Sequence, residues 1–135
     1  TPEATQQLAE TLRELHPEGR LWLLVGATGD KDLAAVLAPL LPDAAGVFAT
    51  HADNPRAAST AEIVATVTAL GYEAWGYETV CAALQAALAL AAPEDLVVTT
   101  GSLFVVGDLL NCWENLKSVS VESAVGAGHA PREED

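Results

Sequence analysis

The feature that most constrains the fold is a run of five apolar residues, 21–25, that ends abruptly at Gly26. The run LWLLV is too short for a helix and lacks the polar alternation of a strand with one exposed face, so it predicts a strand buried on both faces. A second glycine and the charged segment DKD at 30–32 follow directly. Charged groups therefore lie at the carboxyl end of a buried strand, the edge where ligands bind in open α/β sheets.

The rest of the chain alternates between helical periodicity and short apolar segments. Because helices separate the strands, this order predicts right-handed crossovers and a parallel sheet. We expect a Rossmann-like α/β domain of three layers (αβα), with a mostly parallel sheet of five to six strands; the alternation at 118–121 fits a last, antiparallel edge strand. Helical patterns cover 1–15, 33–41, 59–70, 78–92 and 103–116, and strand patterns cover 45–50, 72–76 and 96–100.

One domain accounts for the chain length. With 135 residues, half of them hydrophobic, the chain can bury roughly two thirds of its unfolded surface in a single core. We expect this domain over 1–122 and a disordered acidic tail over 123–135. The chain contains no methionine, which is compatible with a fragment of a longer protein.

The net charge of −13 argues against nucleic acid and anionic membrane surfaces as partners, because the field of the chain repels polyanions. No apolar run reaches the roughly 18 residues of a membrane span, and the amino end lacks a signal-peptide pattern. We therefore expect a cytoplasmic protein. Cys81 and Cys112 lack the spacing of a zinc site or a disulfide framework, and we expect reduced cysteines in the core.

Three loops are predicted to meet at the carboxyl edge of the sheet: 28–32, 51–56 and 100–102. They contain two of the six basic residues of the chain, Lys31 and Arg56, together with carboxylates, hydroxyls and free N–H groups. Such a set of groups can hold a zwitterionic amino acid or a phosphate.

Each of these loops also has a purely structural interpretation. The segment 30–32 can be a solvated turn and helix cap, 54–56 a turn with a surface arginine, and Ser102 the N-cap of the last helix. His51 can be an ordinary loop histidine. A dinucleotide fingerprint, a phosphate-binding loop and a nucleophile elbow are absent from the sequence. Residue types alone therefore indicate an α/β binding domain with an edge that can accept an anion.

Three motifs together resemble a known family. LWLLVGATGDKD at 21–32, HADNPRAA at 51–58 and DLVVTTGSLFVVGDLL at 95–110 are similar to the carboxyl-terminal domain of folylpolyglutamate synthase/dihydrofolate synthase, in the Mur ligase superfamily. The resemblance runs over 1–110. It implies an ATP-dependent amide ligase, in which ATP and Mg²⁺ phosphorylate a folate or pteroate carboxylate and the amino group of L-glutamate attacks the acyl phosphate.

The resemblance also implies roles for single residues. Asn54 and Arg56 would bind the carboxylate of the incoming glutamate, with His51 and Asp53 of the same motif in the same site. Ser102 would add a hydrogen bond to glutamate. A bidentate pair of guanidinium and carboxylate gives this assignment a physical basis.

Asp30, Lys31 and Asp32 match a segment of the family that would face the nucleotide or the interdomain cleft. ATP, Mg²⁺ and most of the folate would be bound by an amino-terminal ATPase domain that the sequence does not include, so we expect no catalytic residue and no metal ligand here, and no activity of the chain alone. The alternative is a free-standing α/β binding or interaction module that kept the fold and lost the reaction.

Overall fold

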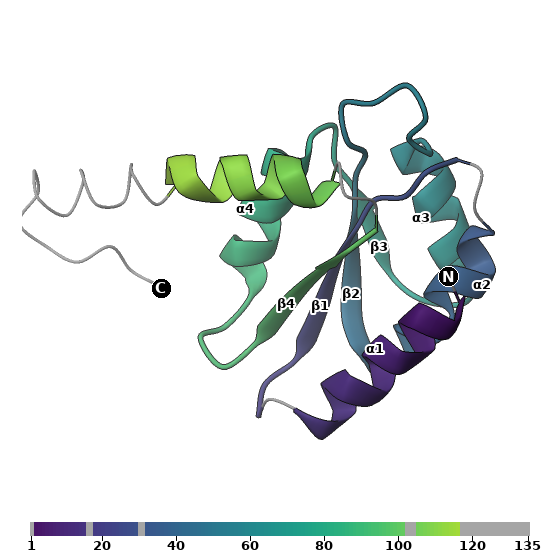
Figure 1. Ribbon diagram of the computed structural model, residues 1–135. Helices are drawn as coiled ribbons and strands as arrows, with labels where there is room; N and C mark the ends of the chain where they lie inside the picture. The colour runs from purple at the N-terminus through teal and green to yellow at the C-terminus, as the bar shows by residue number, and fades with distance from the viewer. Residues whose placement is uncertain (1, 16–17, 30–31, 102–104, 117–135) are drawn as a thin grey trace, which may run out of the picture.

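The computed structural model describes residues 2–15, 18–29, 32–101 and 105–116. A four-stranded parallel sheet with the order β3-β2-β1-β4 lies at its centre (Figure 1). The α/β class and the parallel sheet are confirmed, and the described part of the chain forms four strands, fewer than the expected five to six. The additional strand was expected at 118–121, which lies outside the described residues. The strands are β1 (Leu21–Val25), β2 (Ala44–Ala49), β3 (Ala74–Gly76) and β4 (Leu96–Thr100).

Helices cover both faces of the sheet, which confirms the three layers. One face packs against α1 (Pro2–Glu14), α2 (Leu33–Leu37) and α3 (Thr60–Ala69). The other face packs against α4 (Val80–Leu90) and a helix at 105–116 that follows β4. Figure 1 shows α1 to α3 together on one side, with α4 and the last helix on the other.

Strand β1 divides the hydrophobic core into two halves. Leu21, Leu23 and Val25 point into the cluster under α1 to α3, whereas Trp22 and Leu24 point into the cluster under α4. All five are at most 6% exposed, so the prediction of a strand buried on both faces is confirmed. Strand β4 was also predicted to be buried but is only partly so, because among the described strands it pairs with β1 alone.

Three helices begin at polar residues whose side chains cap them, and the cap at Asp32 was predicted. The carboxylate of Asp32 accepts a hydrogen bond from the Ala35 N–H, and the Thr79 hydroxyl accepts one from the Ala82 N–H. Ser59 forms a capping box with α3. Helix α2 is shorter than the predicted 33–41, because Pro39 has no N–H to continue the helical hydrogen bonds.

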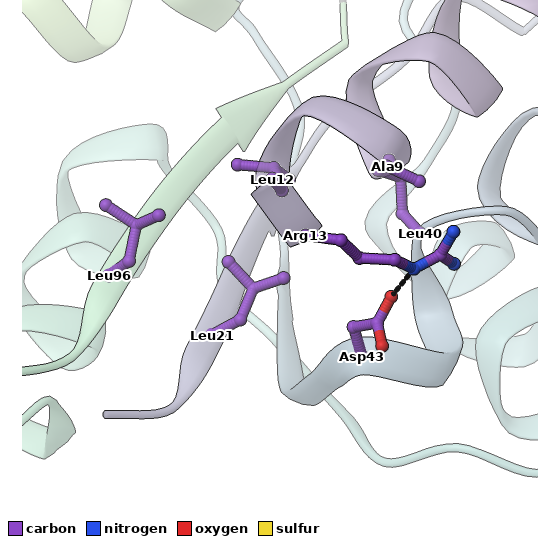
Figure 2. A pocket seen from close by; sticks show the side chains of 7 residues that line it. All are labelled: Ala9, Leu12, Arg13, Leu21, Leu40, Asp43 and Leu96. Carbon is purple, nitrogen blue, oxygen red and sulfur yellow. Dashed lines mark hydrogen bonds and ion pairs between the residues drawn. The ribbon is translucent and has the colours of Figure 1, made fainter. Parts of the chain in front are cut away.

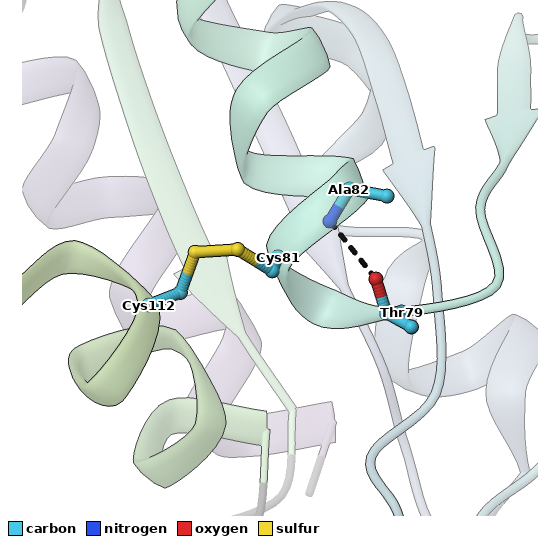
Figure 3. Close-up of a disulfide and its surroundings, with 4 residues drawn as sticks. All are labelled: Thr79, Cys81, Ala82 and Cys112. Atoms are coloured by element: carbon cyan, nitrogen blue, oxygen red, sulfur yellow. Dashed lines mark hydrogen bonds between the residues drawn. A yellow bond between two sulfur atoms is a disulfide. The ribbon is translucent and has the colours of Figure 1, made fainter. Parts of the chain in front are cut away.

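Cys81 and Cys112 form a disulfide with a Cα–Cα distance of 5.5 Å (Figure 3). The prediction of reduced cysteines is therefore wrong. The residues are 31 positions apart in sequence, and only the crossover through β4 brings α4 and the helix at 105–116 onto the same face of the sheet. Local spacing carries no signal of such a contact.

Asp95 joins the starting ends of β1 and β4. Its carboxylate accepts hydrogen bonds from Trp22 Nε1 (2.9 Å), the Ala92 N–H (2.9 Å) and the Arg20 N–H (2.8 Å). These donors, first the Trp22 indole, lower the pKa of Asp95 from its usual 3.8 to about 2. The charged carboxylate is therefore part of the folded structure at the amino edge of the sheet.

The low pKa predicts an acid-dependent loss of stability. A carboxyl group whose pKa is lower in the folded than in the unfolded state stabilises the fold above the unfolded pKa, and this contribution disappears as the pH falls from about 4 to about 2. We expect Asp95→Asn to unfold at lower urea concentration than the wild type at pH 6, with a difference that narrows towards pH 2. Glu10→Gln, which changes an exposed carboxylate on α1, is the control. A difference for Asp95→Asn that is the same at pH 6 and pH 2 would contradict this role.

Candidate functional site

The loops that follow β1 and β2 are joined through their backbones at the carboxyl edge of the sheet. The Gly29 N–H donates to the Arg56 carbonyl (2.8 Å), and the Ala58 N–H donates to the Ala27 carbonyl (2.8 Å). An antiparallel bridge pairs Thr28 with Ala57 between these two bonds. The structure therefore brings together two of the three loops that the sequence placed at this edge.

The segment around Asn54 forms a tight, internally bonded turn. The Asn54 side-chain oxygen accepts from the Arg56 N–H (2.9 Å), and the Asn54 carbonyl accepts from the Ala57 N–H (3.0 Å). Pro55 occupies the second position of this turn, where its fixed φ is favourable. The Asn54 side chain thus fixes the N–H of Arg56, and the loop after β1 fixes the carbonyl group of the same residue.

The Arg56 side chain is exposed. Within the described part of the chain, the ion pairs are those of Arg13 with Asp43 and of Arg20 with Asp95, both at the amino edge. The guanidinium of Arg56 therefore has no ion-pair partner among the described residues. Arg56 thus offers a cation without an ion-pair partner among the described residues, and hydrogen bonds fix its backbone at both the N–H and the carbonyl group. Such a cation is suited to binding an external carboxylate or phosphate.

His51 and Asp53 have structural contacts in this loop. His51 Nδ1 lies 2.7 Å from Thr60 Oγ1, and the Thr60 hydroxyl donates to the Tyr77 carbonyl (3.2 Å). Since the hydroxyl has one proton, this arrangement assigns the donor role to Nδ1. The Asp53 N–H donates to Asp108 Oδ2 (3.3 Å), which connects the loop to the helix at 105–116.

The third loop begins beside the first, at the end of β4. The Gly26 N–H donates to the Thr100 carbonyl (3.4 Å). Gly101 has a φ of +131°, and a Cβ at this position would overlap the Gly26 carbonyl. Only glycine allows this approach. The contact lies between β1 and β4, where the strand order reverses, and such switch points are the usual ligand sites of open α/β sheets. A cavity of about 180 Å³ lies next to it, between the sheet edge and the helices α1 and α2.

The other predicted site residues divide into two groups. Asp32 is the N-cap of α2, so its structural interpretation is confirmed. Asp30, Lys31 and Ser102 lie outside the described residues, and their proposed roles stay predictions. Sequence reasoning missed Asp108, which has no motif around it that indicates a contact with the loop after β2.

The described residues contain no group of three His, Cys, Asp or Glu side chains that could hold a metal ion. None of the helices in the described ranges is long and apolar enough to cross a membrane.

At the opposite, amino edge of the sheet, α1 leaves a gap of about 10 Å³ against β1 and β4 (Figure 2). The ion pair from Arg13 Nε to Asp43 Oδ2 (2.8 Å) closes this gap, which is room for about one water molecule and not a ligand site.

Comparisons with solved structures give the same fold in larger proteins. The chain is similar to E. coli FolC in complex with DHPP and ADP (25% identity, TM-score 0.79, covering 87% of this chain and 27% of that chain). It is also similar to E. coli FolC with ADP and without folate substrate (28%, TM-score 0.76, 87% and 28%). A third similar structure is the folylpolyglutamate synthase of Mycobacterium tuberculosis complexed with ADP and AMPPCP (26%, TM-score 0.74, 86% and 27%). The chain therefore spans about a quarter of the length of these proteins.

A family comparison identifies the same domain from the sequence. The model described as Mur ligase, glutamate ligase domain, matches residues 1–103, and a comparison with curated proteins returned no match. The family match includes β1 to β4 and both joined loops, and the similar structures confirm the resemblance drawn from the three motifs. On this evidence, the chain belongs to the family of glutamate ligase domains of the Mur ligases.

Proposed function

We propose that this chain is the glutamate-binding, cleft-closing domain of an ATP-dependent ligase that adds L-glutamate to folate or dihydropteroate through an acyl phosphate. The observation that carries the proposal is the exposed Arg56 guanidinium on a turn that two loops hold at the carboxyl edge. Family membership supports the reaction class. Among the similar structures is a bifunctional folylpolyglutamate synthase/dihydrofolate synthase with Mn, AMPPNP and L-glutamate bound (23% identity, TM-score 0.71).

The electrostatics of the chain make a localised cation necessary for this role. The net charge of −13 repels a dicarboxylic amino acid at long range. Arg56 offsets this repulsion locally, because a guanidinium binds a carboxylate through two parallel N–H···O bonds. The bonded turn also lowers the entropic cost of ordering the binding loop.

In this proposal the chain positions glutamate and does not activate the folate. Arg56 holds a carboxylate of glutamate, with Ser102 as an additional hydrogen-bond partner, and the amino group remains free to attack the acyl phosphate. ATP and Mg²⁺ supply the phosphorylation of the folate carboxylate. We assign these groups mainly to the amino-terminal ATPase domain that the family resemblance implies, since the chain covers 27% of a similar ligase. The chain alone is expected to be inactive.

Replacing Arg56 tests the proposed glutamate site. In the full-length enzyme, Arg56→Ala should raise the Michaelis constant for L-glutamate roughly 10- to 100-fold, because it removes a charge-assisted bidentate interaction. The Michaelis constants for ATP and folate should change little. Steady-state kinetics with each substrate varied in turn provides the measurement.

Arg13→Ala is the matched control, since it removes the same charge at the opposite edge of the sheet. The Michaelis constant of Arg13→Ala for L-glutamate should stay within about twofold of the wild-type value. An unchanged Michaelis constant for glutamate in Arg56→Ala would contradict the assignment.

Asn54 provides a separate test of how the loop is held. Asn54→Ala removes the acceptor of the Arg56 N–H, so hydrogen exchange at this amide should become about 5- to 10-fold faster. Asn54→Asp keeps an acceptor oxygen in the same position and should exchange at nearly the wild-type rate. Equal exchange rates in the two variants would show that the side chain does not hold the turn.

A further inference from the structure

We propose that the Cys81–Cys112 disulfide is a reversible thiol–disulfide site that reacts with thiols lacking negative charge, and that its redox state controls how firmly the helix at 105–116 holds the loop after β2. The proposal is independent of glutamate binding. It is based on a cavity, three carboxylates that line this cavity, and one hydrogen bond between the helix and the loop.

The disulfide lies in the wall of an open cavity. Both cysteines line a space of about 450 Å³ between the start of α4, the helix at 105–116 and the loop after β2. Cys112 is 5% exposed, whereas Cys81 is only partly buried. Figure 3 shows the bond spanning the two helices next to the first turn of α4. A small thiol can therefore reach the bond from the Cys81 side while the chain stays folded.

Negative charge surrounds this approach. Three carboxylates line the same cavity, those of Asp53, Glu78 and Asp108, and none of its lining residues is lysine or arginine. A thiolate that carries a further carboxylate or sulfonate meets repulsion from all three, whereas an ammonium group on the attacking thiol meets attraction. The cavity therefore discriminates between thiols by their charge.

The exchange proceeds in two balanced steps. The thiolate RS⁻ attacks Cys81 Sγ, the S–S bond breaks, and Cys112 leaves as a thiolate that takes a proton from water. A second RS⁻ attacks the mixed disulfide, which releases RS–SR and the Cys81 thiolate. Two electrons pass from two thiols to the protein disulfide. Cys81 lies in the first turn of α4, where free N–H groups stabilise its thiolate as the leaving group.

The consequence for the loop follows from the helix geometry. Asp108 and Cys112 are four residues apart and share one face of the helix at 105–116. Asp108 accepts from the Asp53 N–H (3.3 Å), and Cys112 fastens the same helix to α4. Without the disulfide, Val105 stays buried and Leu109 and Leu116 still pack against the core. The later turns nevertheless expose Leu110 and Trp113 and lose their covalent attachment. The hydrogen bond from Asp53 to the helix should then open more often.

Reduction kinetics of the folded 135-residue chain test the charge discrimination. We would compare cysteamine, 2-mercaptoethanol and 2-mercaptoethanesulfonate at equal thiolate concentration, with rates normalised to a small uncharged disulfide. At low ionic strength we expect the cationic thiol to react about 10-fold faster than the anionic one. Added salt should lower the ratio of the cationic to the anionic rate, because salt screens exposed charges.

Two variants with the same change in net charge locate the effect. Asp53→Asn/Glu78→Gln/Asp108→Asn removes the carboxylates of the cavity and should bring the ratio close to one. Glu3→Gln/Glu10→Gln/Glu14→Gln removes three exposed carboxylates of α1 on the other face of the sheet and should keep the ratio. The proposal would be overturned if the reduction rate of the wild type did not depend on the charge of the thiol, or if the disulfide were reduced only in denaturant.

Hydrogen exchange without glutamate tests the coupling to the loop. On reduction, the amides at 109–116 and the Asp53 amide should exchange at least about fivefold faster, while the β1 amides stay protected. Cys81→Ser/Cys112→Ser should reproduce the reduced pattern without any reductant. Unchanged exchange at both the helix and Asp53 would overturn the proposed control of the loop.

Discussion

Two backbone hydrogen bonds, from the Gly29 N–H to the Arg56 carbonyl and from the Ala58 N–H to the Ala27 carbonyl, join the loops at the carboxyl edge. They depend on β1 and β2 ending at the same level, because the parallel register pairs Val25 with Ala49. The same level also places Thr100 of β4 opposite Val25. A strand buried on both faces thus fixes the positions from which three loops depart, and the bonded loops present Arg56.

The two edges of the sheet use their charges differently. At the amino edge, Asp95 and the pair of Arg13 with Asp43 bind partners within the chain, so those charges stabilise the fold. At the carboxyl edge, the Arg56 guanidinium has no ion-pair partner among the described residues. A chain with a net charge of −13 has few cations, and one that is not used for stability is available for a ligand.

Much of the fold could be predicted because local rules and global topology agree. The LWLLV run and the cap at Asp32 are local signals, and both appear in the structure where the sequence indicates them. The length of α2 was overestimated because the hydrophobic stripe continues past Pro39, although a proline lacks the N–H that a helix requires. The juxtaposition of the two loops followed from strand order alone, whereas the hydrogen bonds that join them did not.

The remaining features depend on contacts between distant segments. Cys81 meets Cys112, and Asp53 meets Asp108, only because the helix after β4 returns over α4. Neither pair has a sequence pattern that distinguishes it from core cysteines or surface acids. Tertiary packing also decided the burial of β4. Its apolar sequence predicts a buried strand, but its position at the edge of the described sheet leaves its residues partly exposed.

We propose that the carboxyl edge of this domain is a half-site for glutamate. An amide NMR titration of the chain with L-glutamate, with D-glutamate as the control, tests it most directly. We expect shifts that are confined to 26–32, 51–58 and 100–102 and are larger for the L-enantiomer. Shifts around Arg13 and Arg20 at the amino edge, or the same shifts with both enantiomers, would contradict it.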